Sequence, residues 1–152
     1  YELSSIPGLD IQLFFERVVL NFLLGNGDAH LKNFSMLETD DGGLRLAPAY
    51  DIVCSKVVIP KETDCALTLN GKQNKIRRKD FEELGNRLNI LPKVMTDILH
   101  RFEKSHPIVV EQIQHSRLSK DLQEKVERIV TERHQRLFGP ERSQKRTQIS
   151  DF

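Results

Sequence analysis

The chain has 152 residues, of which 38% are hydrophobic and 30% are charged, and its net charge is +1. This composition predicts one globular domain with a core of its own. The near-neutral charge gives no global argument for binding nucleic acid or an anionic membrane. No stretch approaches the ~20 apolar residues that span a bilayer. Cys54 and Cys65 lack metal-type spacing, and we interpret them as reduced thiols of a cytoplasmic protein rather than as a disulfide.

The first predicted element is a buried amphipathic helix that begins near Asp10, a suitable N-cap. Its apolar residues recur at helical spacing: Ile11, Phe14, Phe15, Val18, Val19, Phe22 and Leu23. Gly25 follows the last of them, where a left-handed residue commonly ends a helix. Residues 25–33, which read Gly-Asn-Gly-Asp-Ala-His-Leu-Lys-Asn, are therefore predicted to form a loop that leaves this helix.

A β-hairpin is predicted directly after this loop. Two short apolar stretches, 34–37 and 44–46, flank the turn sequence Asp-Asp-Gly-Gly at 40–43. Asn33 stands at the entrance of the hairpin and Asp51 just past its exit. Because antiparallel pairing brings the two ends of a hairpin together, we expect these two side chains to lie close to each other.

The middle of the chain carries weaker signals. Residues 54–65 have no regular pattern and predict a mobile loop, and residues 67–72 predict a short strand that runs into a turn. Asp80 and Glu83 have the spacing of a capping box, which predicts the start of a helix there.

The C-terminal part is predicted to be helical. Pro92 suits the first turn of a helix, and Pro107 is expected to break that helix or to start the next one. Ser119 is a suitable N-cap for a last helix, which Gly139 and Pro140 close. Residues 141–152 are polar without a core pattern, and we expect them to be disordered.

Asp28, Asn33 and Asp51 together indicate phosphoryl transfer. In such sites one acid takes the proton of the substrate hydroxyl, while an amide and a second acid hold Mg²⁺ against the nucleotide phosphates. Asp28 and Asn33 have the Asp-x-x-x-x-Asn spacing of protein-kinase catalytic loops. The alternative is that Asp28 and Asn33 only bond the loop backbone, as such residues often do in turns.

Three segments of the chain resemble the HipA-type toxin kinases of bacterial toxin–antitoxin systems. They are the loop 25–33 with Phe34-Ser35, the segment Leu-Ala-Pro-Ala-Tyr-Asp at 46–51, and the segment Ala-Leu-Thr-Leu-Asn-Gly-Lys at 66–72. The resemblance implies Asp28 as catalytic base and Asn33 and Asp51 as Mg²⁺ ligands, with ATP as cofactor. His30 and Lys32 belong to the same motif. His30 would orient phosphates or hold the loop, and Lys32 would contact the γ-phosphate or pair with Asp28 or Asp51.

The implied fold is α+β, mainly α: the C-terminal lobe of a protein-kinase-like fold, with a catalytic-loop hairpin and a helical bundle. We expect this lobe to span residues 1–140, with the helical region at 80–138. HipA-like kinases also have an N-terminal lobe with a phosphate-covering loop and a phosphate-binding lysine, and no segment here supplies either. The chain begins at Tyr1 rather than at a methionine, so we expect that lobe upstream or on a partner chain.

The resemblance also implies partners. The γ-phosphate would go to a serine or threonine of a protein, with aminoacyl-tRNA synthetases as the kind of target. An antitoxin of the HipB type would be a further partner, and DNA would be contacted only through it.

The sequence also fits two other functions. The Gly-Asp-x-His-x-x-Asn loop at residues 27–33 also resembles that of phosphatidylinositol kinases, and aminoglycoside-type small-molecule kinases use a related loop. Alternatively, the chain is a kinase-like lobe that serves as a binding module without activity.

Overall fold

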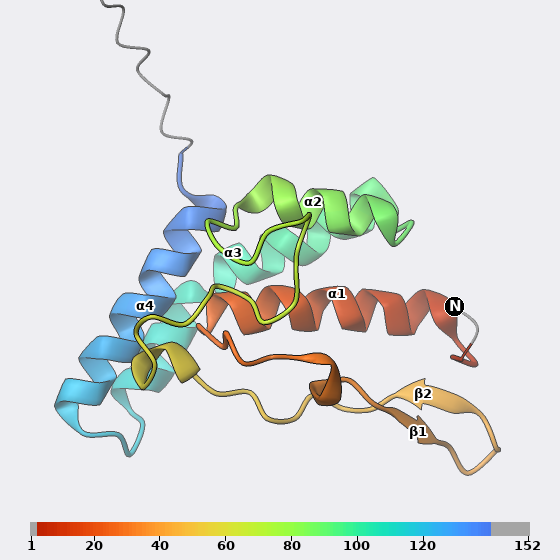
Figure 1. The fold of residues 1–152 in the computed structure, drawn as a ribbon, viewed down its shortest axis with the longest axis horizontal. Helices are drawn as coiled ribbons and strands as arrows, with labels where there is room; N and C mark the ends of the chain where they lie inside the picture. Colours follow the sequence, from red (N-terminus) through yellow and green to blue (C-terminus); the bar gives the residue numbers. More distant parts are fainter. Residues whose placement is uncertain (1–2, 141–152) are drawn as a thin grey trace, which may run out of the picture.

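The computed structural model describes residues 3–140 and shows a mainly helical protein with one small sheet (Figure 1). The helices are α1 (Pro7–Leu23), α2 (Arg78–Arg87), α3 (Pro92–Gln114) and α4 (Lys120–Phe138). The strands are β1 (Met36–Glu38) and β2 (Leu44–Leu46), and two 3-10 turns are η1 (Leu31–Asn33) and η2 (Ser55–Val57). The predicted mixture of a helical bundle and one hairpin is confirmed.

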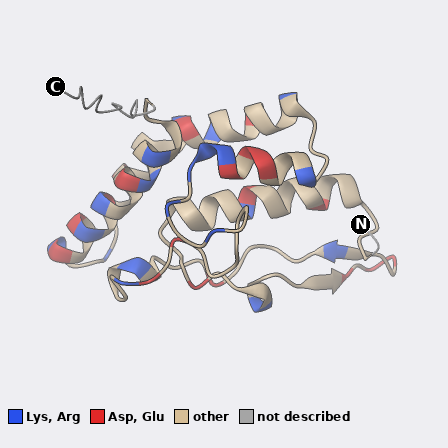
Figure 2. Ribbon diagram, turned by 45° about the horizontal axis from the view of Figure 1, so that its top comes forward, with Lys and Arg blue, Asp and Glu red and all other residues tan. Residues whose placement is uncertain are grey.

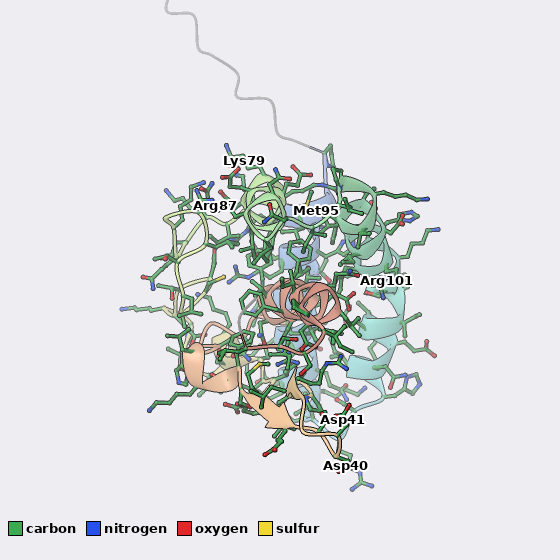
Figure 3. The ribbon with its side chains drawn as sticks, turned by 90° about the vertical axis from the view of Figure 1, so that its right-hand side faces the viewer. Asp40, Asp41, Lys79, Arg87, Met95 and Arg101 are labelled. Carbon is green, nitrogen blue, oxygen red and sulfur yellow. The ribbon has the colours of Figure 1, made fainter. Side chains whose placement is uncertain are left out.

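Helix α1 lies at the centre of the fold. Helices α2 and α3 pack on one side of it, α4 crosses one end, and the hairpin lies on the opposite side (Figures 1 and 3). The core gathers apolar side chains from every helix and from the loop before α2: Phe15, Val19, Phe22, Leu69, Ile76, Phe81, Met95, Ile98, Leu99 and Leu137. The hairpin and the loops that follow it are thereby held along one flank of a rigid helix.

The start of α1 differs from the prediction, because Asp10 is not its N-cap. The helix begins at Pro7, which suits the first helical position. Asp10 lies in the first turn and is 5% exposed. Its carboxylate accepts hydrogen bonds from Arg45 at 3.2 Å and from the backbone N–H of Leu46 at 3.0 Å. The aspartate therefore fastens the beginning of α1 to strand β2 instead of capping the helix.

The hairpin forms as predicted. Met36 pairs with Leu46 and Glu38 with Leu44 in an antiparallel register. Gly42 in the turn has a φ of 75°, a left-handed conformation that a glycine adopts without steric cost.

Of the short strand and the turn predicted at 67–72, the turn is confirmed and the strand is wrong. Only one isolated bridge joins Leu69 and Lys72, because Asn70 and Gly71 are both left-handed, with φ of 50° and 72°, and turn the chain back at once. The start of α2 at Asp80 is also wrong, since the helix begins at Arg78. Asp80 lies in its first turn, where its carboxylate accepts the N–H of Arg77 at 2.9 Å.

The break predicted at Pro107 is wrong as well, since α3 runs through it without interruption. Pro107 has no N–H for the carbonyl of Glu103, and His134 of α4 contacts that carbonyl through Nε2 at 2.9 Å. Pro92 at the start of α3 and Ser119 as the N-cap of α4 are confirmed. The tail expected at residues 141–152 lies outside the described residues.

Charges of both signs are interspersed over the helices (Figure 2), as along α4, where Lys and Arg alternate with Asp and Glu. Within residues 3–140, none of the helices has the length and the apolar character that crossing a membrane requires.

Candidate functional site

The loop 25–33 leaves α1 at a glycine that no other residue could replace without strain. Gly25 has a φ of 71°, as its predicted role at the helix end requires. A Cβ at this position would lie 2.6 Å from Cγ2 of Ile129 on α4. The next residue, Asn26, is 2% exposed, and its amide donates to Oδ1 of Asn21 at 3.0 Å and to the carbonyl of Asp51 at 3.1 Å. The loop is thus fixed to α1, to α4 and to the segment that carries Asp51.

Asn33 and Asp51 meet as the hairpin geometry predicts. The amide Nδ2 of Asn33 donates to Oδ2 of Asp51 at 2.6 Å, and Asn33 Oδ1 accepts the N–H of His30 at 3.0 Å. Asn33 is 5% exposed, whereas Asp51 is exposed. Asp51 has a φ of 54°, an uncommon conformation for a non-glycine residue. Such outliers cluster at functional sites, where the surrounding structure must hold them in place.

Asp28 lies on the same loop with its side chain exposed. Within residues 3–140 its carboxylate has no hydrogen-bond or ion-pair partner. A carboxylate without a structural partner does not support the reading of Asp28 as a residue that merely bonds the loop backbone. It is free to accept a proton from a molecule that approaches from solvent.

The other predicted residues of the loop are also exposed. Lys32 forms no ion pair with Asp28 or Asp51 in the described part of the chain, so the pairing considered for it is not observed. Its backbone carbonyl accepts a hydrogen bond from the hydroxyl of Tyr50 at 2.6 Å, and that hydroxyl also lies 3.2 Å from Ser35 Oγ. His30 is exposed and contributes its backbone N–H to Asn33. Tyr50 therefore braces the 3-10 turn η1, while His30 and Lys32 are exposed to solvent.

The oxygen atoms of this site suit Mg²⁺. Asp51 offers two carboxylate oxygens, and Asn33 Oδ1 keeps a second lone pair besides the one that accepts from His30. Mg²⁺ prefers hard oxygen ligands and is commonly bound by one or two protein side chains together with phosphates and water. Asn33 and Asp51 fit that pattern.

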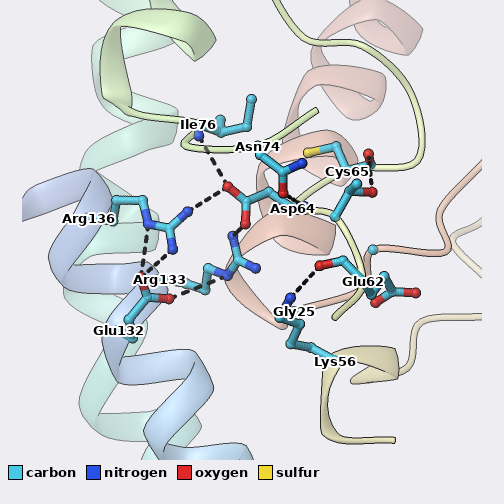
Figure 4. Close-up of polar contacts among 12 residues, drawn as sticks. Gly25, Lys56, Glu62, Asp64, Cys65, Asn74, Ile76, Glu132, Arg133 and Arg136 are labelled. Carbon is cyan, nitrogen blue, oxygen red and sulfur yellow. Dashed lines mark hydrogen bonds and ion pairs between the residues drawn. The ribbon is translucent and has the colours of Figure 1, made fainter. Parts of the chain in front are cut away.

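Sequence reasoning missed a second layer that supports the loop. The segment 54–65 is predicted to be an irregular mobile loop, but it contains η2, which lies against the start of the loop 25–33 together with the residues that follow it (Figure 4). The N–H of Gly27 donates to Ser55 Oγ at 3.0 Å, and Ser55 Oγ donates to Glu62 Oε2 at 2.7 Å. Lys56 donates its N–H to the carbonyl of Gly25 at 3.1 Å and its Nζ to the carbonyl of Glu62.

Asp64 then fastens this segment to α4 (Figure 4). Its carboxylate pairs with Arg133 and with Arg136, the latter at 2.6 Å, and accepts the N–H of Ile76 at 3.1 Å. Burial alone would raise the pKa of Asp64, but the two guanidinium charges and the backbone N–H outweigh it, and the pKa lies below its ordinary value. Asp64 and Arg136 are 72 positions apart, and neither carries a local signal that could have predicted the contact.

Comparison with known proteins agrees with the resemblance. The model of a family described as the HipA-like C-terminal domain matches residues 3–137. The chain is 31% identical over 90 residues to a Sinorhizobium fredii protein named "Putative kinase Y4dM", which covers 58% of this chain and 22% of that protein. It is 42% identical over 57 residues to "Putative kinase Y4mE" of the same organism, covering 38% of this chain and 13% of that protein. A Haemophilus influenzae protein named "Putative kinase" is 46% identical over 39 residues, covering 26% of this chain and 11% of that protein. The chain thus matches only a fraction of each relative's length.

Proposed function

This chain belongs to the family of HipA-like C-terminal domains, and on that premise we propose that it is the catalytic lobe of an ATP-dependent serine/threonine protein kinase. The observation that carries the proposal is the contact of Asn33 with Asp51 at 2.6 Å, together with an exposed Asp28 on the same loop as Asn33, whose carboxylate has no partner among residues 3–140. From this side of a kinase cleft, phosphoryl transfer needs two oxygen ligands for the metal ion and one carboxylate that accepts a proton. Asn33 and Asp51 offer the ligands, and Asp28 offers the carboxylate.

Each residue has a distinct role in this proposal. When bound, Mg-ATP supplies the γ-phosphate and the charge neutralisation of the reaction. Asn33 and Asp51 hold the metal through their side-chain oxygens, while Asp28 accepts the proton of the attacking hydroxyl. Lys32, exposed beside them, would contact the γ-phosphate, and His30 would hold the loop through its backbone bond to Asn33.

The remaining parts of the proposal concern partners. The phosphate-covering loop and the phosphate-binding lysine of HipA-like kinases would come from an N-terminal lobe, in cis or in trans. The substrate would be a serine or threonine of a protein, with aminoacyl-tRNA synthetases as the kind of target. An antitoxin of the HipB type would bind the complete toxin kinase in the cytoplasm and would mediate any contact with DNA.

Binding of Mg-ATP, measured by calorimetry, tests the metal site. Asp51→Asn should weaken Mg-dependent nucleotide binding at least tenfold, because it replaces a charged carboxylate by a neutral amide. Asp40→Asn in the hairpin turn is the matched control, since it removes the same charge from an exposed carboxylate and should leave binding unchanged. Equal binding by both variants would contradict the assignment of Asp51.

Transfer of phosphate tests the base. With the N-terminal lobe present, Asp28→Asn should lower kcat by about 10²–10⁴-fold, the contribution typical of a positioned general base, while leaving Mg-ATP affinity within a few-fold. A complete protein that keeps its cellular effect with both Asp28→Asn and Asp51→Asn would instead be a binding module.

A further inference from the structure

We propose that Ser55 and Glu62 form a positioning pair that holds the catalytic loop in its active conformation, an inference that rests on the proposed kinase function. The pair acts on the backbone directly before Asp28. Ser55 is therefore a positioning residue and not a catalytic one.

The hydrogen-bond directions follow from the donors available. The N–H of Gly27 can only donate, and it does so to Ser55 Oγ at 3.0 Å. The single proton of the Ser55 hydroxyl then goes to Glu62 Oε2 at 2.7 Å rather than to the carbonyl of Gly25 at 3.4 Å. A carboxylate acceptor makes a charge-assisted bond, which is shorter and stronger than a bond between neutral groups. The negative charge also polarises the hydroxyl oxygen, which strengthens the bond that it accepts from Gly27.

The packing around Gly27 leaves no room for a side chain at this position. A Cβ at this position would lie 2.5 Å from the carboxyl group of Glu62 and 2.5 Å from the carbonyl oxygen of Thr63. The backbone of the loop therefore rests directly on the glutamate. The two bonds of Lys56, to the carbonyls of Gly25 and of Glu62, hold the same segments together.

This arrangement matters because the side chain of Asp28 has no partner within residues 3–140. Its direction therefore depends on the backbone of the loop, which is bonded to Ser55 at Gly27, directly before Asp28. Misplacing a catalytic group by about 1 Å can cost about 10²-fold in rate. Losing the pair should consequently lower kcat while leaving the nucleotide site formed by Asn33 and Asp51 intact.

Two variants separate positioning from folding. Ser55→Ala removes both bonds and should lower kcat about 10–100-fold, with KM for ATP changed by less than about threefold. Ser55→Thr keeps the hydroxyl and should restore most of the rate, and Glu62→Gln keeps an acceptor without the charge and should give an intermediate rate. Ser105→Ala on α3 is the matched control and should leave kcat unchanged, because within residues 3–140 this hydroxyl bonds the carbonyl of Phe102 alone, in its own helix.

Amide hydrogen exchange of Gly27 provides a readout that needs no activity. Exchange should be slow in the unsubstituted chain, faster by at least tenfold in Ser55→Ala, and slow again in Ser55→Thr. Ser55→Ala with unchanged kcat in an active protein, or with unchanged exchange at Gly27, would overturn the positioning role. No transfer by the unsubstituted two-lobed protein would instead refute the proposed function, and the positioning role with it.

Discussion

Breaking the ion pairs of Asp64 should destabilise this fold strongly, because Asp64 and Arg133 are both buried. Asp64→Asn removes the charge that faces Arg133, whose side chain is 2% exposed, and Arg136. Removing one partner of a buried pair typically costs about 3–5 kcal/mol, because the other charge stays buried without compensation. Glu132 lies 3.5 Å from Arg133 but is half exposed, so it compensates only in part. We therefore expect a loss of about 3 kcal/mol, at the lower end of that range.

Urea unfolding followed by circular dichroism measures this loss, which corresponds to a decrease in Tm of roughly 6–12 °C for a domain of this size. Asp121→Asn is the matched control. Its pair with Lys125 is exposed on both sides, and such pairs contribute about 0–1 kcal/mol. If the two variants differed by less than about 1 kcal/mol, the structural role of the buried pair would be refuted.

The same aspartate gives the expected dependence on pH. Because the pKa of Asp64 is lower in the folded state, the unfolded chain binds protons more readily in acid. The stabilisation is therefore fully present above the ordinary aspartate pKa of about 3.9 and is lost as the pH falls through the folded value. The free energy of unfolding of Asp64→Asn should vary less with pH in this range than that of the unsubstituted chain.

Two further predictions concern the residues around the loop. Gly25→Ala should destabilise the fold by about 1–3 kcal/mol more than Gly42→Ala. Both glycines are left-handed, but the new Cβ would collide with Ile129 at Gly25 and would meet no atom within 4 Å at Gly42. Urea unfolding of both variants measures the difference, and equal losses of stability would contradict the close contact. Burial, together with the charge of Asp64, raises the pKa of Cys65 to about 12. Iodoacetamide at pH 8 should therefore modify this thiol at least tenfold more slowly in the folded chain than in the chain unfolded by guanidinium. Mass spectrometry measures both rates. Similar rates in both states would show that Cys65 is accessible.

The parts of the site that the sequence predicted are those whose signals are local. Gly25 at a helix end and a turn between two short apolar stretches each follow from a few neighbouring residues. The meeting of Asn33 with Asp51 follows from the hairpin alone, since pairing of its strands brings both ends together whatever packs around them.

The parts that the sequence did not predict depend on tertiary contacts. Asp10 has the residue type of an N-cap, but its burial against Arg45 decides its role. Residues 67–69 have the composition of a strand, but the part of the chain that the structure describes places no strand beside them, and a strand requires a partner. Ser55 and Glu62 have no motif at all, because their role arises only when η2 folds back onto Gly27.

Pro107 shows how such a contact overrides a strong local signal. A proline inside a helix leaves the carbonyl four residues earlier without its donor and usually breaks or kinks the helix. Here the carbonyl is that of Glu103, and Nε2 of His134 lies 2.9 Å from it. Since a carbonyl oxygen only accepts, Nε2 must carry the proton. Helix α4 thus supplies to α3 the hydrogen bond that the proline removes.

A double-mutant cycle tests this compensation. His134→Phe should lower the free energy of unfolding by more than the change in packing explains, because the carbonyl of Glu103 also loses its hydrogen-bond donor. The loss of that hydrogen bond adds about 0.5–1.5 kcal/mol. In a Pro107→Ala background the helix supplies its own N–H, so the same substitution should cost less by about that amount. Urea unfolding of the four proteins gives the coupling energy directly. A coupling near zero would mean that α3 tolerates Pro107 without help from α4, and that the contact with His134 is incidental to the continuity of the helix.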